Sequence, residues 1–234
     1  MQAFHNNPKI KADLVAQLEA HYAADEIIKG TYWENGKGCA VGCCVHGNDH
    51  GLFPVHFGIP ESIAYLMDEI FEALPNEQAK EFPLKLVKSI QVGADLSKVE
   101  NLFLEWLLID PVHGVSRFNP DPCIPAVAAL HRRVADGDSV NPEEWDAAGD
   151  AAWAAWAAGA AWAARAAAWA ARAAGDAAWA AGAAWAARAA AWAAWAAGDA
   201  AWAAAGAAWA ARAAQAQKFI ELLAAAPAEA KTGA

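Results

Sequence analysis

The residues best suited to chemistry gather in one glycine-rich segment, Tyr32 to His56, which contains three cysteines and three histidines. Cys39, Cys43, His46 and His50 are spaced four, three and four residues apart. On a helix this spacing would place them on one face. Helical residues seven positions apart are about 10 Å apart, which is too far for one ion whose ligand bonds are about 2 Å long. At most one neighbouring pair can therefore bind a given ion.

Metal binding is one interpretation of this segment. A neighbouring pair among Cys43, His46 and His50 would contribute ligands to a zinc ion, with His113, His131 or an acidic side chain completing the shell. The paired C-x-x-C spacing of a zinc ribbon is absent. A cysteine nucleophile with His46 as its base is a second interpretation, because thiolate chemistry needs an adjacent base or a positive environment. Both interpretations require proximity in space as well as the right spacing.

Anion binding is the third interpretation. Glycines around Lys37 let the backbone approach a phosphate, the amides of a helix beginning after Gly38 would point outward, and Lys37 adds a positive charge. Trp33 would stack a base. The spacing differs from a P-loop, because no Ser or Thr follows the lysine. The structural alternative is a glycine-rich loop packed on the core with small cysteine side chains. The predicted ligand-binding residues are Trp33, Lys37, Gly38, Cys39, Gly42, Cys43, His46 and His50.

Helices are expected on both sides of this segment. Apolar residues at steps of four predict a helix from Pro8 to about Ile28. A strongly periodic helix begins at Pro60 and ends before Pro75, whereas Pro83 is expected to interrupt the next one. Residues 31–58 read as a long irregular loop, the kind of loop that tends to be functional. Region 1–140 is thus predicted to be short helices around one apolar core.

The composition changes abruptly near residue 141, and residues 141–226 are predicted to form an Ala/Trp/Arg-rich helical array. Asn141 followed by proline and two glutamates is a strong helix start. Residues 153–175 and 176–198 are two copies of a 23-residue repeat that differ at two positions. Alanine is the best helix former, so the predicted fold class is all-α. Residues 227–234 are predicted to be a disordered tail.

Two arrangements of the repeats fit the spacing of their non-alanine residues. Gly-Asp pairs near the repeat boundaries favour helices folded back into an antiparallel bundle over one long supercoiled rod. The ten tryptophans between residues 153 and 209 are expected to form the packing of that array. A cleft in which Trp and Arg hold a base and a phosphate is the functional alternative, and an oligomer or partner surface is another.

The net charge of −10 lies in the first 145 residues, because residues 146–214 carry four Asp and four Arg and are neutral. This acidity disfavours generic binding to nucleic acid or to an anionic membrane. The charges in the alanine-rich tract are too frequent for a lipid-spanning helix, and no secretory leader is recognisable. Crowded cysteines fit a reducing compartment, so a cytoplasmic location is expected.

Several motifs together resemble a family of uncharacterised proteins from phages and bacteria. Some of these proteins have similar Ala/Trp/Arg-rich tails and are labelled immunity proteins. The resemblance covers most of the chain, and the motifs of its first region are the specific part. They are NGKGCAVGC (35–43), the pair His46 and His50, GIP (58–60), IFEALPN (70–76), VGADLS (92–97) and WLLID (106–110).

The resemblance implies a role in host–phage conflict, in the host cytoplasm if the chain is phage-encoded. The leading functional hypothesis is a non-catalytic, homo-oligomeric protein that sequesters a nucleotide-derived immune signal and needs no cofactor. Its predicted phosphate ligand is Lys37, with His46 and His50 as hydrogen-bond donors. One alternative is a metal- or Cys/His-dependent hydrolase of a phosphorylated substrate. Another is an immunity-type protein that blocks a protein partner.

Overall fold

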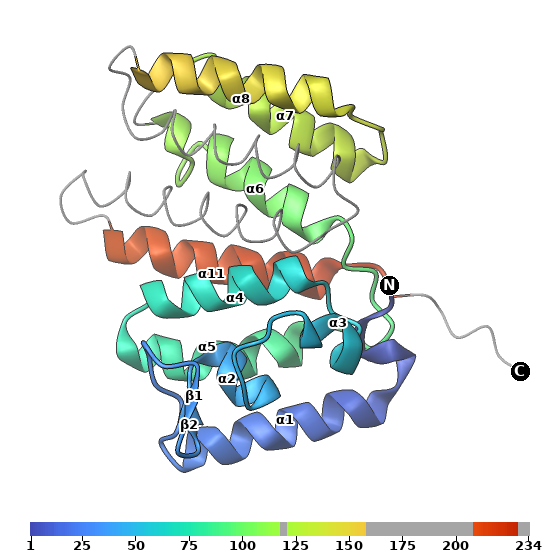
Figure 1. Ribbon diagram of the computed structural model, residues 1–234, viewed down its shortest axis with the longest axis vertical. Coiled ribbons are helices and arrows are strands. Elements are labelled where there is room, and N and C mark those ends of the chain that lie inside the picture. The colour runs from blue at the N-terminus through green and yellow to red at the C-terminus, as the bar shows by residue number, and fades with distance from the viewer. Residues whose placement is uncertain (118–120, 158–207, 229–234) are drawn as a thin grey trace, which may run out of the picture. The chain divides into compact units, whose positions relative to one another are not determined.

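The computed structural model describes residues 1–117, 121–157 and 208–228, and it confirms the all-α fold class (Figure 1). Helices dominate these residues, and their only sheet is a two-stranded hairpin. The chain divides into two compact units. One comprises residues 1–99 together with the C-terminal residues from Phe219, and the other comprises residues 100–218.

The described elements follow one another along the chain in a simple order. They are η1 (Ala3–Asn6), α1 (Pro8–Ala23), β1 (Trp33–Glu34), β2 (Lys37–Gly38), α2 (Ala40–Val45), α3 (Leu52–Phe57), α4 (Glu61–Ala73), α5 (Asn76–Ser89), α6 (Val99–Ile109), η2 (Val115–Arg117), α7 (Cys123–Asp136), α8 (Pro142–Ala157) and α11 (Ala208–Ala225).

Helix α1 begins where the sequence predicts and ends earlier. Asn7 caps it by accepting a hydrogen bond from the Lys9 amide, 2.9 Å away, and Pro8 fits the first turn. The prediction that the helix continues to about Ile28 is wrong, because it ends at Ala23. Asp25 has a φ of 54°, a left-handed conformation that a right-handed helix cannot contain. The freed segment pairs with the hairpin instead.

Helices α4 and α5 pack on each other. Helix α4 also packs on α2 and α3 of the glycine-rich segment, and α5 packs on α1. The buried face of α4, from Ile63 to Phe71, confirms the predicted periodic helix. The expected interruption at Pro83 is wrong, because α5 runs through it from Asn76 to Ser89. Buried side chains on both sides of the proline, including Phe82 and Leu86, hold the two halves of α5 against the core.

The two ends of the first unit meet at one backbone segment. The Ala3 amide donates to the Ala94 carbonyl at 2.9 Å, and the Asp95 amide donates to the Pro227 carbonyl at 2.8 Å. Ala228 also bridges Ala94. The beginning of the expected disordered tail is therefore held by backbone hydrogen bonds, while residues 229–234 lie outside the described residues.

Helices α7 and α8 of the second unit pack together around a buried histidine. His131 Nδ1 lies 2.9 Å from Asn101 Oδ1, and its ring centroid lies 4.9 Å from that of Trp145. Burial lowers the pKa of His131 to about 3, so this side chain is neutral and serves the core. Helix α8 begins as predicted, because the Asn141 and Glu144 side chains cap each other's backbone amides.

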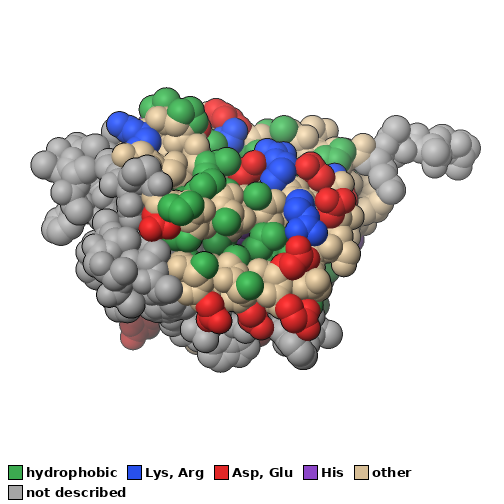
Figure 2. Space-filling view, turned by 90° about the horizontal axis from the view of Figure 1, so that it is seen from above, with side chains coloured by type: hydrophobic (Ala, Val, Ile, Leu, Met, Phe, Trp, Pro, Cys, Tyr) green, Lys and Arg blue, Asp and Glu red, His purple; other side chains and the backbone are tan. Residues whose placement is uncertain are grey.

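The surface view shows described basic and acidic side chains interspersed with apolar ones on the face turned to the viewer (Figure 2).

The array predicted for residues 141–226 is described only at its two ends, where α8 and α11 are helical. The prediction of a folded-back bundle rather than a long rod concerns residues outside the described part. The prediction that the ten repeat tryptophans form the packing of the array likewise concerns side chains that are not described.

Candidate functional site

The glycine-rich segment, predicted to be irregular, begins with a hairpin that the sequence interpretation missed. Trp33 pairs with Gly38 and Glu34 with Lys37. The turn between them is Asn35-Gly36, with φ values of 52° and 83°, the left-handed pair that a two-residue hairpin turn requires. The hairpin lies beside α2 in the ribbon view (Figure 1), and β2 contacts α2. The signal that could have revealed it is an Asn-Gly pair between two potential strands.

Two of the predicted phosphate-binding glycines are needed for close backbone packing. A Cβ would lie 2.0 Å from the Tyr32 carbonyl oxygen at Gly38, and 1.4 Å from the same atom at Gly42. Their amides are also engaged within the protein. The Gly38 amide donates to the Glu26 carbonyl at 3.0 Å, and the Gly42 amide donates to Cys39 Sγ at 3.4 Å. These contacts explain both glycines without a ligand.

The cysteines of the segment are buried thiols. Cys39 caps α2, and Cys43 Sγ donates to the Gly38 carbonyl at 3.3 Å. Burial is the main cause that raises the pKa of Cys43 to about 12, and it raises the pKa of Cys39 and of Cys44 as well. All three are therefore protonated at neutral pH in this structure, which disfavours a thiolate nucleophile.

Four side chains form what we call the imidazole cluster: Trp33, His46, His21 and Glu26. The His46 ring stacks on the Trp33 ring at 4.4 Å between centroids. His46 Nε2 lies 3.0 Å from His21 Nε2, and His21 Nδ1 lies 2.7 Å from a Glu26 carboxylate oxygen. Two residues that the sequence interpretation did not select, His21 from α1 and Glu26 from the turn after it, therefore complete this cluster.

The geometry of the imidazole cluster restricts its protons. One arrangement of hydrogens fits these distances: His21 donates from Nδ1 to Glu26, and His46 donates from Nε2 to His21 Nε2. Partial burial and the neighbouring His21 lower the pKa of His46. The His46 ring therefore carries no positive charge at neutral pH in the free protein. A bound anion would favour the uptake of a further proton.

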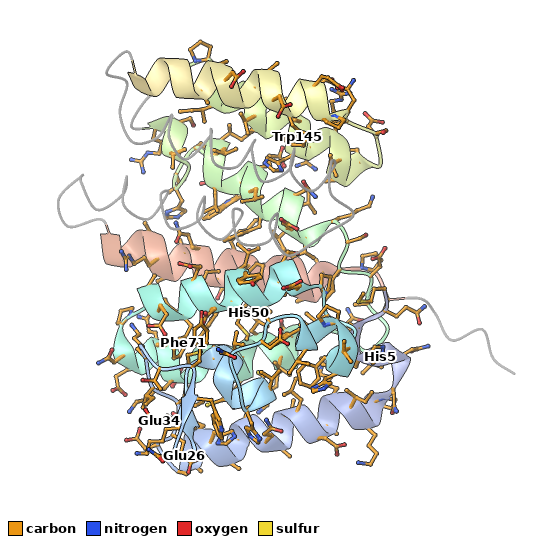
Figure 3. All side chains as sticks on the ribbon, viewed as in Figure 1. His5, Glu26, Glu34, His50, Phe71 and Trp145 are labelled. Carbon is orange, nitrogen blue, oxygen red and sulfur yellow. The ribbon has the colours of Figure 1, made fainter. Side chains whose placement is uncertain are left out.

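A second group, which we call the carboxylate cluster, comprises Cys39, His50, Asp68 and Glu72. His50 is 4% exposed, its Nε2 lies 3.3 Å from Asp68 Oδ2, and its ring stacks on that of Tyr65 at 4.0 Å. Figure 3 shows His50 beside α4, well separated from Glu26 at the lower end of the hairpin. The loop histidines expected to act together thus belong to two clusters.

The pKa values of acidic groups in and around the carboxylate cluster are raised, which means that their negatively charged forms are disfavoured. Burial, followed by the charges of Asp68 and Glu72, raises the pKa of Glu69 to about 7. Burial, followed by the charge of Asp68, raises the pKa of Tyr32 to about 12. Burial also raises the pKa of Glu72. Perturbed carboxyl groups of this kind are common at functional sites and also occur in structural networks.

The remaining predicted ligand, Lys37, is exposed and lies opposite Glu34 in the hairpin. Taken together, the structure unites Trp33 with His46 and places Cys39, Gly42 and Cys43 in the α2 turn. It does not bring ligand atoms of Cys43, His46 and His50 together as a metal site; among the described residues, three such atoms converge at Cys39, Asp68 and Glu72.

A cavity of about 340 Å³ opens elsewhere on the first unit. Its lining includes apolar Ile27 and Phe71 together with Lys29 and Lys80. None of the predicted ligand-binding residues lines it. Lys80 is paired there with Asp25 at 2.6 Å.

Comparison with family models, characterised proteins and solved structures finds no match to this chain. The family suggested by the sequence motifs therefore stays a prediction. Among the described helices, none combines the length and apolar character needed to cross a bilayer.

Proposed function

We propose that this protein binds a small anionic ligand of the nucleotide type at the imidazole cluster and sequesters it without chemical change. The observation that carries the proposal is the stack of Trp33 and His46, with a second imidazole, His21, within hydrogen-bonding distance of His46. The sequence resemblance to phage and bacterial proteins directs the proposal toward a nucleotide-derived immune signal.

The chemistry of the imidazole cluster suits the two parts of a nucleotide. Indole and imidazole rings offer flat faces on which a base can stack. His46 is exposed, so it can stack the base itself or move aside and uncover the Trp33 ring. Uptake of a second proton at Nδ1 would give the His46 ring a charged N–H donor for a phosphate oxygen while its Nε2–H stays on His21. Exposed Lys37, on the same hairpin, adds a mobile positive charge.

Sequestration is favoured over turnover by the state of the thiols. The alternative hydrolase would act through Cys43, but burial keeps that thiol protonated by raising its pKa. Cys43 also donates its proton to the Gly38 carbonyl rather than to a histidine. A nucleophile needs an adjacent base within hydrogen-bonding reach.

The test is recovery of the ligand. Purified full-length protein is incubated with a panel of cyclic mono- and dinucleotides, washed, and denatured by heat, and the released compounds are analysed by mass spectrometry. We expect one nucleotide to be recovered intact. Recovery of a cleaved product would contradict sequestration. Copurification of a stoichiometric protein with no nucleotide bound would favour the partner-blocking alternative.

Variants locate the ligand. Trp33→Ala and His46→Ala should each weaken its binding at least about tenfold, the effect of losing one stacking or hydrogen-bonding group. His56→Ala, which removes another exposed histidine of the segment, is the matched control. If Lys80→Ala weakens binding and Trp33→Ala does not, the ligand occupies the cavity and this assignment of the site is wrong.

A further inference from the structure

We propose that Cys39, Asp68 and Glu72 form a binding site for a divalent cation of the zinc class, separate from the imidazole cluster. One ligand atom from each residue lies within 4.8 Å of the other two. Around a tetrahedral zinc ion, ligand atoms about 2.0–2.3 Å from the metal lie roughly 3–4 Å from one another. Small side-chain rotations therefore suffice to form the site.

A buried carboxylate oxygen of Asp68 that makes no hydrogen bond is available to a cation. Asp68 is 9% exposed, and its Oδ1 makes no hydrogen bond, although Oδ2 contacts His50. The Tyr32 hydroxyl and the Cys39 thiol interact with this carboxylate, yet neither gives Oδ1 a hydrogen bond of ordinary geometry. A buried carboxylate oxygen is costly unless it is paired or bound to a metal. A cation between Asp68, Glu72 and Cys39 would satisfy it.

The fold positions each of the three ligands. Asp68 and Glu72 are four residues apart on α4, so their carboxylates lie on the same side of the helix. Cys39 is the N-cap of α2, where its sulfur accepts a hydrogen bond from the Gly42 amide. Amide donors of this kind stabilise a thiolate. His50 contacts Asp68 from the other side and is a positioning residue, as hydrogen-bonding partners of metal ligands usually are.

The donor set decides the class of ion. Calcium and magnesium prefer shells made of oxygen atoms alone, whereas a thiolate together with carboxylates suits a borderline ion such as zinc. Binding breaks the S–H bond of Cys39, releases its proton to solvent and forms the sulfur–metal bond. Three protein ligands leave the fourth tetrahedral position open to water.

The experiment adds Zn²⁺ to chelator-treated full-length protein and measures its affinity by competition with a chromophoric chelator. We expect one Zn²⁺ per chain. Cys39→Ser and Glu72→Gln should each weaken binding at least about 100-fold. The matched controls are Cys43→Ser, a buried thiol one turn further along α2, and Glu77→Gln on α5, which should both stay within about threefold of the parent.

Cobalt supplies a spectroscopic readout of the sulfur ligand, which is visible already in the unsubstituted protein. Co²⁺ added to the unsubstituted protein should give a sulfur-to-cobalt charge-transfer band, which Cys39→Ser should remove and Cys43→Ser should retain. Because Glu72 is exposed, Glu72→Gln remains informative even if Cys39→Ser fails to fold. The proposal is overturned if the unsubstituted protein binds no Zn²⁺, or if Cys43→Ser weakens binding and Glu72→Gln does not.

Discussion

The imidazole cluster and the carboxylate cluster use neighbouring residues of the same segment for opposite purposes. Trp33 contacts His46 and His21, while the preceding residue, Tyr32, contacts the buried His50. The first cluster contains two imidazoles and one carboxylate near the surface. The second places one buried imidazole beside the buried Asp68 carboxylate and Cys39 thiol, with the exposed carboxylate of Glu72 at its edge. The proposals above assign an anion to the first cluster and a cation to the second.

The comparison shows that residue type alone does not assign chemistry to a histidine. His46 and His50 are four residues apart, and their spacing predicts that they serve one ligand. His46 is the left-handed C-cap of α2 and is exposed, whereas His50 is buried against Asp68. The backbone conformation at the end of α2 sends the two side chains to different environments.

The largest expected effect concerns His131, which lies outside both clusters and sets the acid limit for studying them. Its pKa is lowered from 6.5 to about 3 in the folded protein. Below pH 6.5 the unfolded chain therefore binds a proton that the folded chain does not, so stability falls as the pH falls toward 3. Linkage sets the loss at up to about 5 kcal/mol by pH 3, of which about 3 kcal/mol falls between pH 7 and pH 4.

Urea unfolding between pH 7 and pH 4 measures this effect. His131→Gln should flatten the pH dependence of the unfolding free energy, and His56→Gln, an exposed control, should not. If the unfolding free energy of His131→Gln depends on pH as steeply as that of the parent, the acid sensitivity arises in the clusters instead. A loss of ligand binding at low pH could then not be told apart from unfolding.

Gly42→Ala should damage both clusters at once. Its Cβ would lie 1.4 Å from the Tyr32 carbonyl oxygen, so the backbone that places Tyr32 and Trp33 must move. We expect a loss of about 3 kcal/mol or more in unfolding free energy, as for other severe overpacking. Gly47→Ala, where the nearest atom is 3.9 Å away, should change stability by less than about 0.5 kcal/mol. Equal effects would mean that close packing at α2 does not support the clusters.

The pH dependence of binding should have opposite signs at the two clusters. The proposed function has a nucleotide draw a proton to His46, whose pKa is lowered in the free protein. Affinity should therefore rise as the pH falls from about 7.5 to about 6, by up to about tenfold per unit. Zinc binding releases the Cys39 proton, so its affinity should fall over the same range. Calorimetry in buffers of different ionisation enthalpy measures the number of protons taken up or released when each ligand binds. If both ligands cause uptake, or both cause release, the two clusters do not differ in the way proposed.

The smallest effect is expected at the hairpin turn. Gly36 has a φ of 83°, and a Cβ at this position would meet no other atom within 4 Å, so Gly36→Ala is penalised by backbone conformation alone. That penalty is about 1–2 kcal/mol. Thermal unfolding measures it. If Gly36→Ala is as damaging as Gly42→Ala, the turn rather than the contact with Tyr32 positions the clusters.

Much of the fold is predictable from local signals. Alanine content and apolar periodicity predict an all-α chain, and the caps at Asn7 and Asn141 lie where the sequence places them. The Asn-Gly pair carries a hairpin signal that the irregular-loop interpretation overlooks. Asp25 gives no sequence sign of its left-handed conformation, so the predicted end of α1 is too late.

The site is less predictable because its partners are distant in sequence. His21 and Glu26 precede the glycine-rich segment, and Asp68 and Glu72 follow it on a helix where an acidic pair resembles an ordinary solvated face. Only packing brings them to the loop. The sequence assigns the glycines to a phosphate, whereas the Tyr32 carbonyl explains Gly38 and Gly42 directly.

A crossed titration tests the central claim most directly. His46→Ala and Asp68→Asn are each titrated with Zn²⁺ and with the nucleotide recovered from the unsubstituted protein. The two-cluster account predicts that His46→Ala loses at least about tenfold in nucleotide affinity and keeps its zinc affinity, while Asp68→Asn does the reverse. If either substitution weakens both ligands equally in a folded protein, the segment forms one site and the account is wrong.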